Sequence, residues 1–127
     1  MFERLTADAI VAAHAAFIAY ACLGGILASR HPAWSLAHLP AAAWAAWVEW
    51  TASICPLTPL ENHWRRLAGE AGYDGGFVER YLIPLVYPPG LTPRAQAWLA
   101  AGLVALNVAI YAWAWVRWRA RRESASP

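Results

Sequence analysis

One feature constrains the fold more than any other: a long, predominantly apolar run that covers residues 7–28. As an α-helix this run would be about 33 Å long, which is enough to cross the hydrocarbon core of a bilayer. Thr6 is suited to cap such a helix. A second run of similar length covers residues 93–116, starts at Thr92-Pro93 and would extend about 35 Å as a helix. Both runs predict helices that can span a membrane.

The composition also indicates a membrane protein. Hydrophobic residues make up 60% of the 127-residue chain and charged residues 14%, whereas about a quarter of the residues in soluble domains are charged. A soluble chain of this length could not bury so much apolar surface, because small domains hide only part of the surface of their unfolded chain. The net charge of +2, without a basic face of interleaved aromatic residues, argues against a nucleic-acid partner.

Shorter segments complete the expected fold. Residues 39–55 form an apolar run that is just long enough to cross as a helix. Residues 59–71 have the pattern of an amphipathic helix at a lipid–water boundary. Residues 77–87 would extend only about 16 Å and are expected to form a short re-entrant or interfacial helix. Residues 117–127 are a basic tail. We therefore expect one all-α integral membrane bundle of three to four membrane-embedded helices plus one interfacial amphipathic helix.

The arginines bear on how many helices cross. Three crossings would place the termini on opposite sides, with Arg65 and Arg66 away from the arginines of the tail. Four crossings would place Arg4, Arg65, Arg66 and the tail together on the cytoplasmic side, as the positive-inside rule favours. The fourth crossing requires residues 77–88 to span the bilayer although they are short and kinked. On the arginine distribution we prefer four crossings, with a cytoplasmic C-terminus.

A corner is predicted between the second apolar run and the amphipathic helix. Pro56 cannot continue a helix and disfavours helical angles at Cys55. Thr58, Pro59 and Glu61 then fit a capping box with proline at the first helical position. In that box Thr58 accepts from the backbone N–H of Glu61, whose side chain reaches back. This interpretation makes the stretch structural, with Cys55 as a small buried apolar residue.

Polar groups inside the apolar runs are candidates for function, because they cost free energy unless they face partners or cavities. His14 and Glu49 lie in the first and second runs. Counting outward from the loop near Ala33 places them within roughly one helical turn of the same depth. We therefore predict a hydrogen bond between them. Such a pair either fixes the register of the two helices or forms a ligand or proton site.

Other polar residues extend this list. His38 shares a helical stripe of small residues with Glu49, on the side away from the tryptophans of that helix. Glu79 either pairs with Arg80 at the membrane interface or joins Glu49 as a second carboxylate. For Asn107 a hydrogen bond to a neighbouring helix is expected.

Several motifs are spread along the chain: HLP at residues 38–40, CPLTPLEN at 55–62, AGEAGY at 68–73 and YLIP at 81–84. With these motifs the chain resembles the bacterial family called domain of unknown function 2784, from His14 to about Asn107. The long CPLTPLEN string makes the resemblance specific. The resemblance implies a small bacterial inner-membrane protein. It implies no activity and no catalytic residues, because the family has none assigned.

Two functions are compatible with these features. The first is a structural or accessory subunit of a larger membrane complex, or a homo-oligomer, because the chain is small and has no soluble domain; exposed tryptophans on the second helix would dock. The alternative is a ligand-binding protein that holds a metal, haem or quinone at His14 and Glu49, with His38 or Glu79. A metal would need a third ligand and haem an axial histidine, so no cofactor is predicted. Transport would require an oligomer.

Overall fold

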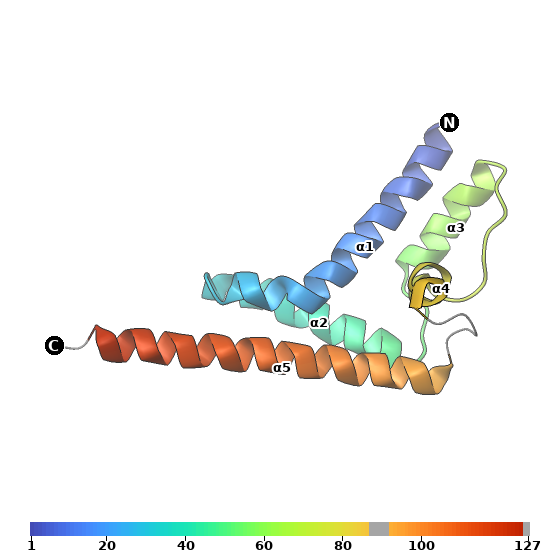
Figure 1. The fold of residues 1–127 in the computed structure, drawn as a ribbon. Helices are drawn as coiled ribbons and strands as arrows, with labels where there is room; N and C mark the ends of the chain where they lie inside the picture. Colours follow the sequence, from blue (N-terminus) through green and yellow to red (C-terminus); the bar gives the residue numbers. More distant parts are fainter. Residues whose placement is uncertain (87–91, 126–127) are drawn as a thin grey trace.

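The structure, a computed structural model, describes residues 1–86 and 92–125 and is all-α in those residues (Figure 1). The helices are α1 (Phe2–Ala28), α2 (Ser35–Trp50), α3 (Leu57–Leu67), α4 (Ile83–Val86) and α5 (Pro93–Ser124). A 3-10 turn, η1 (Pro32–Trp34), leads into α2, and a π-helical turn, η2 (Val78–Leu82), leads into α4. The predicted all-α class is therefore confirmed for these residues.

Two helices, α1 with 27 residues and α5 with 32, are long and apolar enough to cross a membrane. These are the two runs that the sequence marks most strongly. α1 begins at Phe2, before the predicted start at residue 7. Thr6 consequently lies inside the helix, where its hydroxyl donates to the Phe2 carbonyl at 3.0 Å instead of capping.

The basic tail belongs to α5. The start of α5 is as predicted, since the Thr92 hydroxyl accepts from the Ala95 N–H at 3.1 Å. Its end differs, because arginines of the tail lie over tryptophans one helical turn earlier. The Arg122 guanidinium is 3.8 Å from the centre of the Trp118 ring. Such contacts contribute about 0.5–1 kcal/mol each at exposed sites, and α5 continues to Ser124 rather than ending near residue 116.

α2 is displaced toward the N-terminus relative to its predicted range of residues 39–55. It starts at Ser35 because η1 runs directly into it, and Pro40 is accommodated inside the helix. It ends at Trp50 because Ala52 takes a left-handed backbone with φ of 51°. The Thr51 hydroxyl closes this end by donating to the Trp47 carbonyl at 2.7 Å.

The helices form two groups that share α1. Figure 1 shows that α1 is bent: its C-terminal part packs with α2 and α5, and its N-terminal part leaves α5 and packs with α3. α2 runs alongside α5. η2 and α4 lie at the same end of the molecule as α3, where α4 is seen end-on in this view. This arrangement leaves α1 as the helix that connects both groups.

The preferred four-crossing arrangement stays a prediction, because α1 and α5 are the helices of the described residues that are long and apolar enough to cross. The N- and C-termini lie at opposite ends of the molecule (Figure 1). η2 contains 5 residues and α4 contains 4, which gives about 14 Å of helix in the described part of this segment. The predicted end of this segment, Tyr87-Pro88-Pro89-Gly90, lies outside the described residues.

The pattern of burial is the reverse of that in a soluble protein, where large apolar side chains are inside. The buried apolar residues are small ones such as Ala21 and Ala100, apart from Phe77. Large apolar side chains are exposed on the helix surfaces, with Trp47 at 61% and Val108 at 62%. Small residues inside allow helix backbones to approach closely. A large exposed apolar surface needs something apolar to cover it.

Candidate functional site

A cavity of about 380 Å³ lies between α1, α2, α5 and the segment that begins at Gly76. Its walls are mainly apolar, with aromatic side chains from each of these elements. Its volume is within the range of small-molecule sites, which are mostly apolar with a few placed polar groups. Two of the polar groups in its wall are His14 and Glu49, the residues that the sequence singles out.

His14 is held by stacking rather than by hydrogen bonding. Its side chain, on α1, is 4% exposed and lies on the ring of Phe77, with ring centres 4.1 Å apart and an angle of 28° between the planes. Its Nδ1 is buried and has no hydrogen-bond partner among the described residues. A buried polar atom without a partner costs free energy. His14 therefore has an unmet hydrogen-bonding capacity at the cavity.

Glu49, which lines the cavity from α2, also has an unmet hydrogen-bonding capacity. One carboxyl oxygen, Oε2, is buried and has no partner among the described residues. Gln96 of α5 lines the same cavity. The predicted hydrogen bond between His14 and Glu49 is wrong, because no such bond exists in the part of the chain that the structure describes and Phe77 covers the His14 ring instead. Both residues do face the bundle interior, as predicted.

His38 and Asn107 form a separate cluster that does not line the cavity. His38 is fully buried; its Nδ1 is 2.9 Å from the Tyr111 hydroxyl and its Nε2 is 3.3 Å from the Ala21 carbonyl. Asn107 donates to the same carbonyl at 3.0 Å, so the predicted bond to a neighbouring helix is confirmed. Gly24 allows this packing, since a Cβ there would be 2.5 Å from His38 Cδ2. His38 thus fastens α2 to α1 and α5 and does not join Glu49.

Glu79 lines the cavity but is exposed, and the described residues contain no ion pair between Glu79 and Arg80. Arg80 lies over the Tyr73 ring instead, 5.5 Å from its centre. Within the described ranges, no group of three or more His, Cys, Asp or Glu side chains could hold a metal ion. His14 and Glu49 therefore lack the third ligand that a metal would need. Cys55 and Cys22 line the cavity as free thiols.

The predicted capping box is wrong. α3 begins at Leu57, with Pro56 as its N-cap, so Pro59 is not the first helical residue. The Thr58 hydroxyl oxygen is buried and has no partner among the described residues. The Glu61 side chain points to other partners. Local spacing suggested a cap, but contacts from distant parts of the chain decide where this carboxylate goes.

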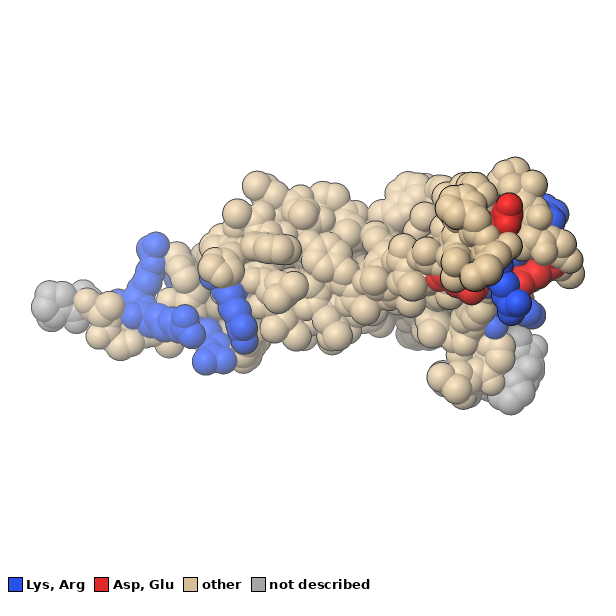
Figure 2. Space-filling model, turned by 90° about the horizontal axis from the view of Figure 1, so that it is seen from above, with Lys and Arg blue, Asp and Glu red and all other residues tan. Residues whose placement is uncertain are grey.

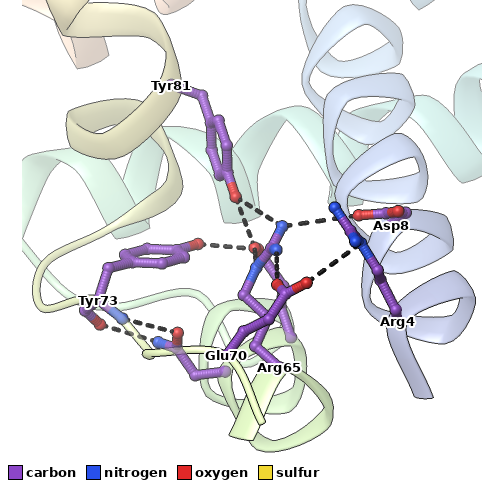
Figure 3. Close-up of polar contacts among 8 residues, drawn as sticks. Arg4, Asp8, Arg65, Glu70, Tyr73 and Tyr81 are labelled. Atoms are coloured by element: carbon purple, nitrogen blue, oxygen red, sulfur yellow. Dashed lines mark hydrogen bonds and ion pairs between the residues drawn. The ribbon is translucent and has the colours of Figure 1, made fainter. Parts of the chain in front are cut away.

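Glu61 belongs to a buried polar cluster that the sequence did not reveal; Figure 3 labels its partners Arg65, Tyr73 and Tyr81. Its side chain is fully buried. Its Oε1 accepts from Arg65 Nε at 2.8 Å and from the Tyr81 hydroxyl at 2.7 Å. Its Oε2 accepts from the Tyr73 hydroxyl at 2.8 Å. Both oxygens are therefore satisfied, which leaves this carboxylate no free position for a ligand.

Arg65 connects the cluster to α1. It donates to Glu70 at 2.9 Å and approaches Asp8 of α1 at 3.8 Å. Glu70 in turn pairs with Arg4 of α1 at 3.1 Å (Figure 3). These contacts join α3, the following loop and the N-terminal part of α1. In the sequence, only the spacing of Glu61 and Arg65, one helical turn apart, indicated any contact of this cluster.

Asn62 holds the same loop from the next position of α3. It donates to the Tyr73 carbonyl at 2.9 Å and accepts from the Tyr73 N–H at 3.0 Å. The loop itself turns through Gly69 and Gly75, which have φ of 76° and 88°. Glycine adopts these left-handed angles without steric cost. This turn places Tyr73 beside Glu61.

The contacts within the cluster shift the pKa values of its carboxyl and phenol groups. Burial alone would raise the pKa of Glu61, but hydrogen bonds from Tyr81, Arg65 and Tyr73 and the charge of Arg65 outweigh it, so the pKa lies below its ordinary value of 4.5. Burial and the hydrogen bond to Glu61 raise the pKa of Tyr73 well above 10.0. Glu61 is thus ionised and both phenols are protonated at neutral pH, which indicates a structural cluster.

Comparison with known proteins gives one match. The model of a family described as "Protein of Unknown function (DUF2784)" matches residues 4–112. This range includes the cavity residues and the Glu61 cluster. No curated protein and no solved structure matches the chain.

Proposed function

Because the chain belongs to the DUF2784 family, whose description assigns no activity, we propose a function from its own geometry: a small bacterial inner-membrane protein that holds a lipid-soluble molecule between α1, α2 and α5. The resemblance in motifs supports the bacterial inner membrane. The large exposed apolar side chains and the two long apolar helices support insertion. In Figure 2 the charged residues gather at the two ends of the molecule, and the middle of this face carries none.

Three crossings fit these features best. α1 and α5 have the required length. α2 has 16 residues, and η1 adds 3 in direct continuation, so that together they extend about 30 Å, the thickness of a hydrocarbon core. α3, η2 and α4 would then lie at one membrane surface, which suits the amphipathic character predicted for α3. The protein would be multi-pass with its termini on opposite sides.

The tail arginines favour a cytoplasmic C-terminus. Arg117 and Arg119 follow directly on the apolar part of α5, and no acidic group within the described residues pairs with them. At the other end, Arg65 and Arg66 lie on the 11-residue helix α3 rather than at the end of a helix long enough to span. Arginines close to the end of a spanning helix favour the cytoplasmic side. This orientation places the Glu61 cluster on the opposite side.

One observation carries the ligand proposal: His14 and Glu49 line the same apolar cavity, and each has a buried polar atom, Nδ1 and Oε2, without a partner among the described residues. Leaving such atoms buried without partners costs about 1–3 kcal/mol each. A bound molecule that supplies hydrogen bonds would remove that cost. A lipid-soluble organic molecule fits this wall better than a metal ion, which would need a third ligand.

The experiment is to purify the protein in native-lipid particles, extract it with organic solvent and identify retained small molecules by mass spectrometry. We expect one non-phospholipid compound in near-stoichiometric amount. Less of it should be retained by His14→Phe, which keeps a ring to stack on Phe77, and by Glu49→Leu. His63→Phe, at an exposed position of α3, is the matched control and should retain it. Equal retention by all three variants would refute the site.

A second candidate, an accessory subunit of a larger membrane complex or a homo-oligomer, is favoured by a different surface. A hollow between the outer faces of α2 and α5 is lined by small residues, including Ala46 and Ala101, and is flanked by Trp47 and Trp50. Small residues at a helix surface allow a further helix to pack closely. The exposed tryptophans were predicted as a docking face.

This candidate has its own test. Ala101→Phe fills the hollow, whereas Ala112→Phe, also on α5, adds the same ring at an exposed position outside it. Tagged protein would be recovered from native membranes in mild detergent and sized. If the subunit role holds, only Ala101→Phe should lose the partner or the oligomer. Recovery of the unaltered protein as a lone chain would count against this role.

A further inference from the structure

We propose that the molecule held by the cavity is an uncharged, lipid-soluble phenol or quinol, that is, an aromatic ring bearing a hydroxyl group. This inference rests on the proposed ligand-binding function and names the chemistry of the ligand. Three properties of the wall carry it: its charges, its aromatic side chains and the kind of hydrogen bonds it leaves unmade.

The charges of the wall disfavour an anionic ligand. Among the described residues that line the cavity are two carboxylates, Glu49 and Glu79, and no arginine. The chain as a whole has no lysine. An anionic head group, such as a phosphate or carboxylate, would therefore meet like charges without a basic partner. Fatty acids and the head groups of anionic phospholipids are poor candidates for this cavity.

The aromatic side chains favour a ring. The His14 ring and the Phe77 ring lie stacked in the wall, and Phe17, Trp44 and Trp98 contribute further aromatic surface. Aromatic rings gain from offset or edge-to-face contact with other rings beyond the area they bury. An aliphatic chain would bury similar area without this additional term.

The two unpartnered atoms favour a hydroxyl. The Oε2 of Glu49 accepts hydrogen bonds when the carboxylate is ionised, and it then needs a donor from the ligand. The Nδ1 of His14 is a donor or an acceptor according to its tautomer, and a hydroxyl can meet either form because it both donates and accepts. A ketone or an ether could only accept and would leave the oxygen of an ionised Glu49 without a partner, whereas a hydroxyl can donate to the ionised form and accept from the protonated form. The head group is therefore one that carries an O–H.

Binding of four probes to the protein in lipid nanodiscs, corrected for empty nanodiscs, tests this inference. The probes are 4-octylphenol, its methyl ether 4-octylanisole, 1-decanol and decanoate. We expect 4-octylphenol to bind at least about ten-fold more tightly than the ether, which cannot donate, and more tightly than the decanol, which has no ring. Decanoate should bind most weakly.

Variants then assign the preference to the two residues. In Glu49→Leu the ratio of phenol to ether affinity should fall to about one, and in His14→Phe it should fall in part, while ring binding persists. Glu123→Leu, in the exposed part of α5, is the control and should keep the ratio of the unaltered protein. A substitution that only destabilises the protein would weaken the binding of both probes alike and would leave the ratio of their affinities unchanged.

The outcomes separate this inference from the function on which it rests. Equal affinity for phenol and ether in the unaltered protein would overturn the hydroxyl, and equal affinity for phenol and decanol would overturn the ring; the cavity would still be a ligand site in both cases. If both variants kept the ratio of phenol to ether affinity of the unaltered protein, His14 and Glu49 would not be the residues that recognise the hydroxyl. Absence of saturable binding for all four probes would overturn the ligand site itself.

Discussion

Arg65 Nε lies 2.8 Å from Oε1 of Glu61, one helical turn earlier on α3, and the carboxylate that it neutralises has no exposure to solvent. Tyr73 and Tyr81 complete the hydrogen bonds of this carboxylate from the loop and from η2. The ion pair and the two tyrosines therefore hold the segment from Tyr73 to Tyr81 against α3. This segment carries Phe77, whose ring covers His14 in the cavity wall.

We expect Arg65→Leu to destabilise the protein by about 3 kcal/mol, because it leaves a buried carboxylate without its positive partner. Thermal unfolding in a fixed detergent would measure the loss. Arg66→Leu is the matched control: its side chain is exposed on the same helix, and its effect should stay within about 0.5 kcal/mol. Similar melting of the two variants would show that the pair does not hold this end of the molecule together.

Glu61 should also make the stability depend on pH. Its folded-state pKa lies below the ordinary value of 4.5, so the unfolded chain takes up the proton first. The stabilisation by the ionised carboxylate is therefore complete above this value and is lost as the pH falls through the lower, folded-state pKa. Unfolding of the unaltered protein and of Glu61→Gln should be compared from pH 7 to pH 3. Their difference in stability should narrow on acidification; a constant difference would contradict the assignment.

The helices could be predicted where a single apolar run is long enough to decide the matter. α1 and α5 appear in their predicted places because no alternative structure satisfies so many apolar residues and backbone groups at once. The ends could not be predicted as well. α2 ends at Trp50 because of the left-handed backbone at Ala52, for which a run of alanines and tryptophans gives no signal.

The candidate site was predicted in part. That His14 and Glu49 face the interior follows from the cost of polar groups in an apolar helix. Their relation to each other does not follow, because Phe77, far along the chain, takes the face of the His14 ring. The role of Glu61 was missed for the same reason: its phenol partners are 12 and 20 residues away. Contacts between distant segments leave no mark in local spacing.

The fit of His38 beneath Gly24 gives a prediction about packing. A Cβ at Gly24 would be 2.5 Å from His38 Cδ2 and 2.8 Å from the Tyr20 ring, so Gly24→Ala should force the buried histidine to move. We expect a loss of about 1–3 kcal/mol in unfolding measurements. Gly102→Ala on α5 is the control, since among the described residues no atom beyond its chain neighbours and the backbone of its own helix lies within 4 Å of its added Cβ. A Gly24→Ala variant as stable as this control would argue against the close contact.

The last prediction concerns the three crossings, and it follows from the opposite positions of the two termini (Figure 1). In a background without native cysteines, with Cys22 and Cys55 replaced by alanine, single cysteines would be placed by Glu3→Cys and Ser124→Cys. An impermeant maleimide should label the first in intact cells and the second only after lysis, because the tail arginines hold the C-terminus in the cytoplasm. Arg66→Cys, on α3, should behave as Glu3→Cys does.

If neither terminus were labelled before lysis, both would be cytoplasmic, as four crossings require, and the segment that contains η2 and α4 would have to cross despite its length. Labelling of the C-terminus alone would keep three crossings and reverse their orientation, since the arginines paired at the Glu61 end would then outweigh those of the tail.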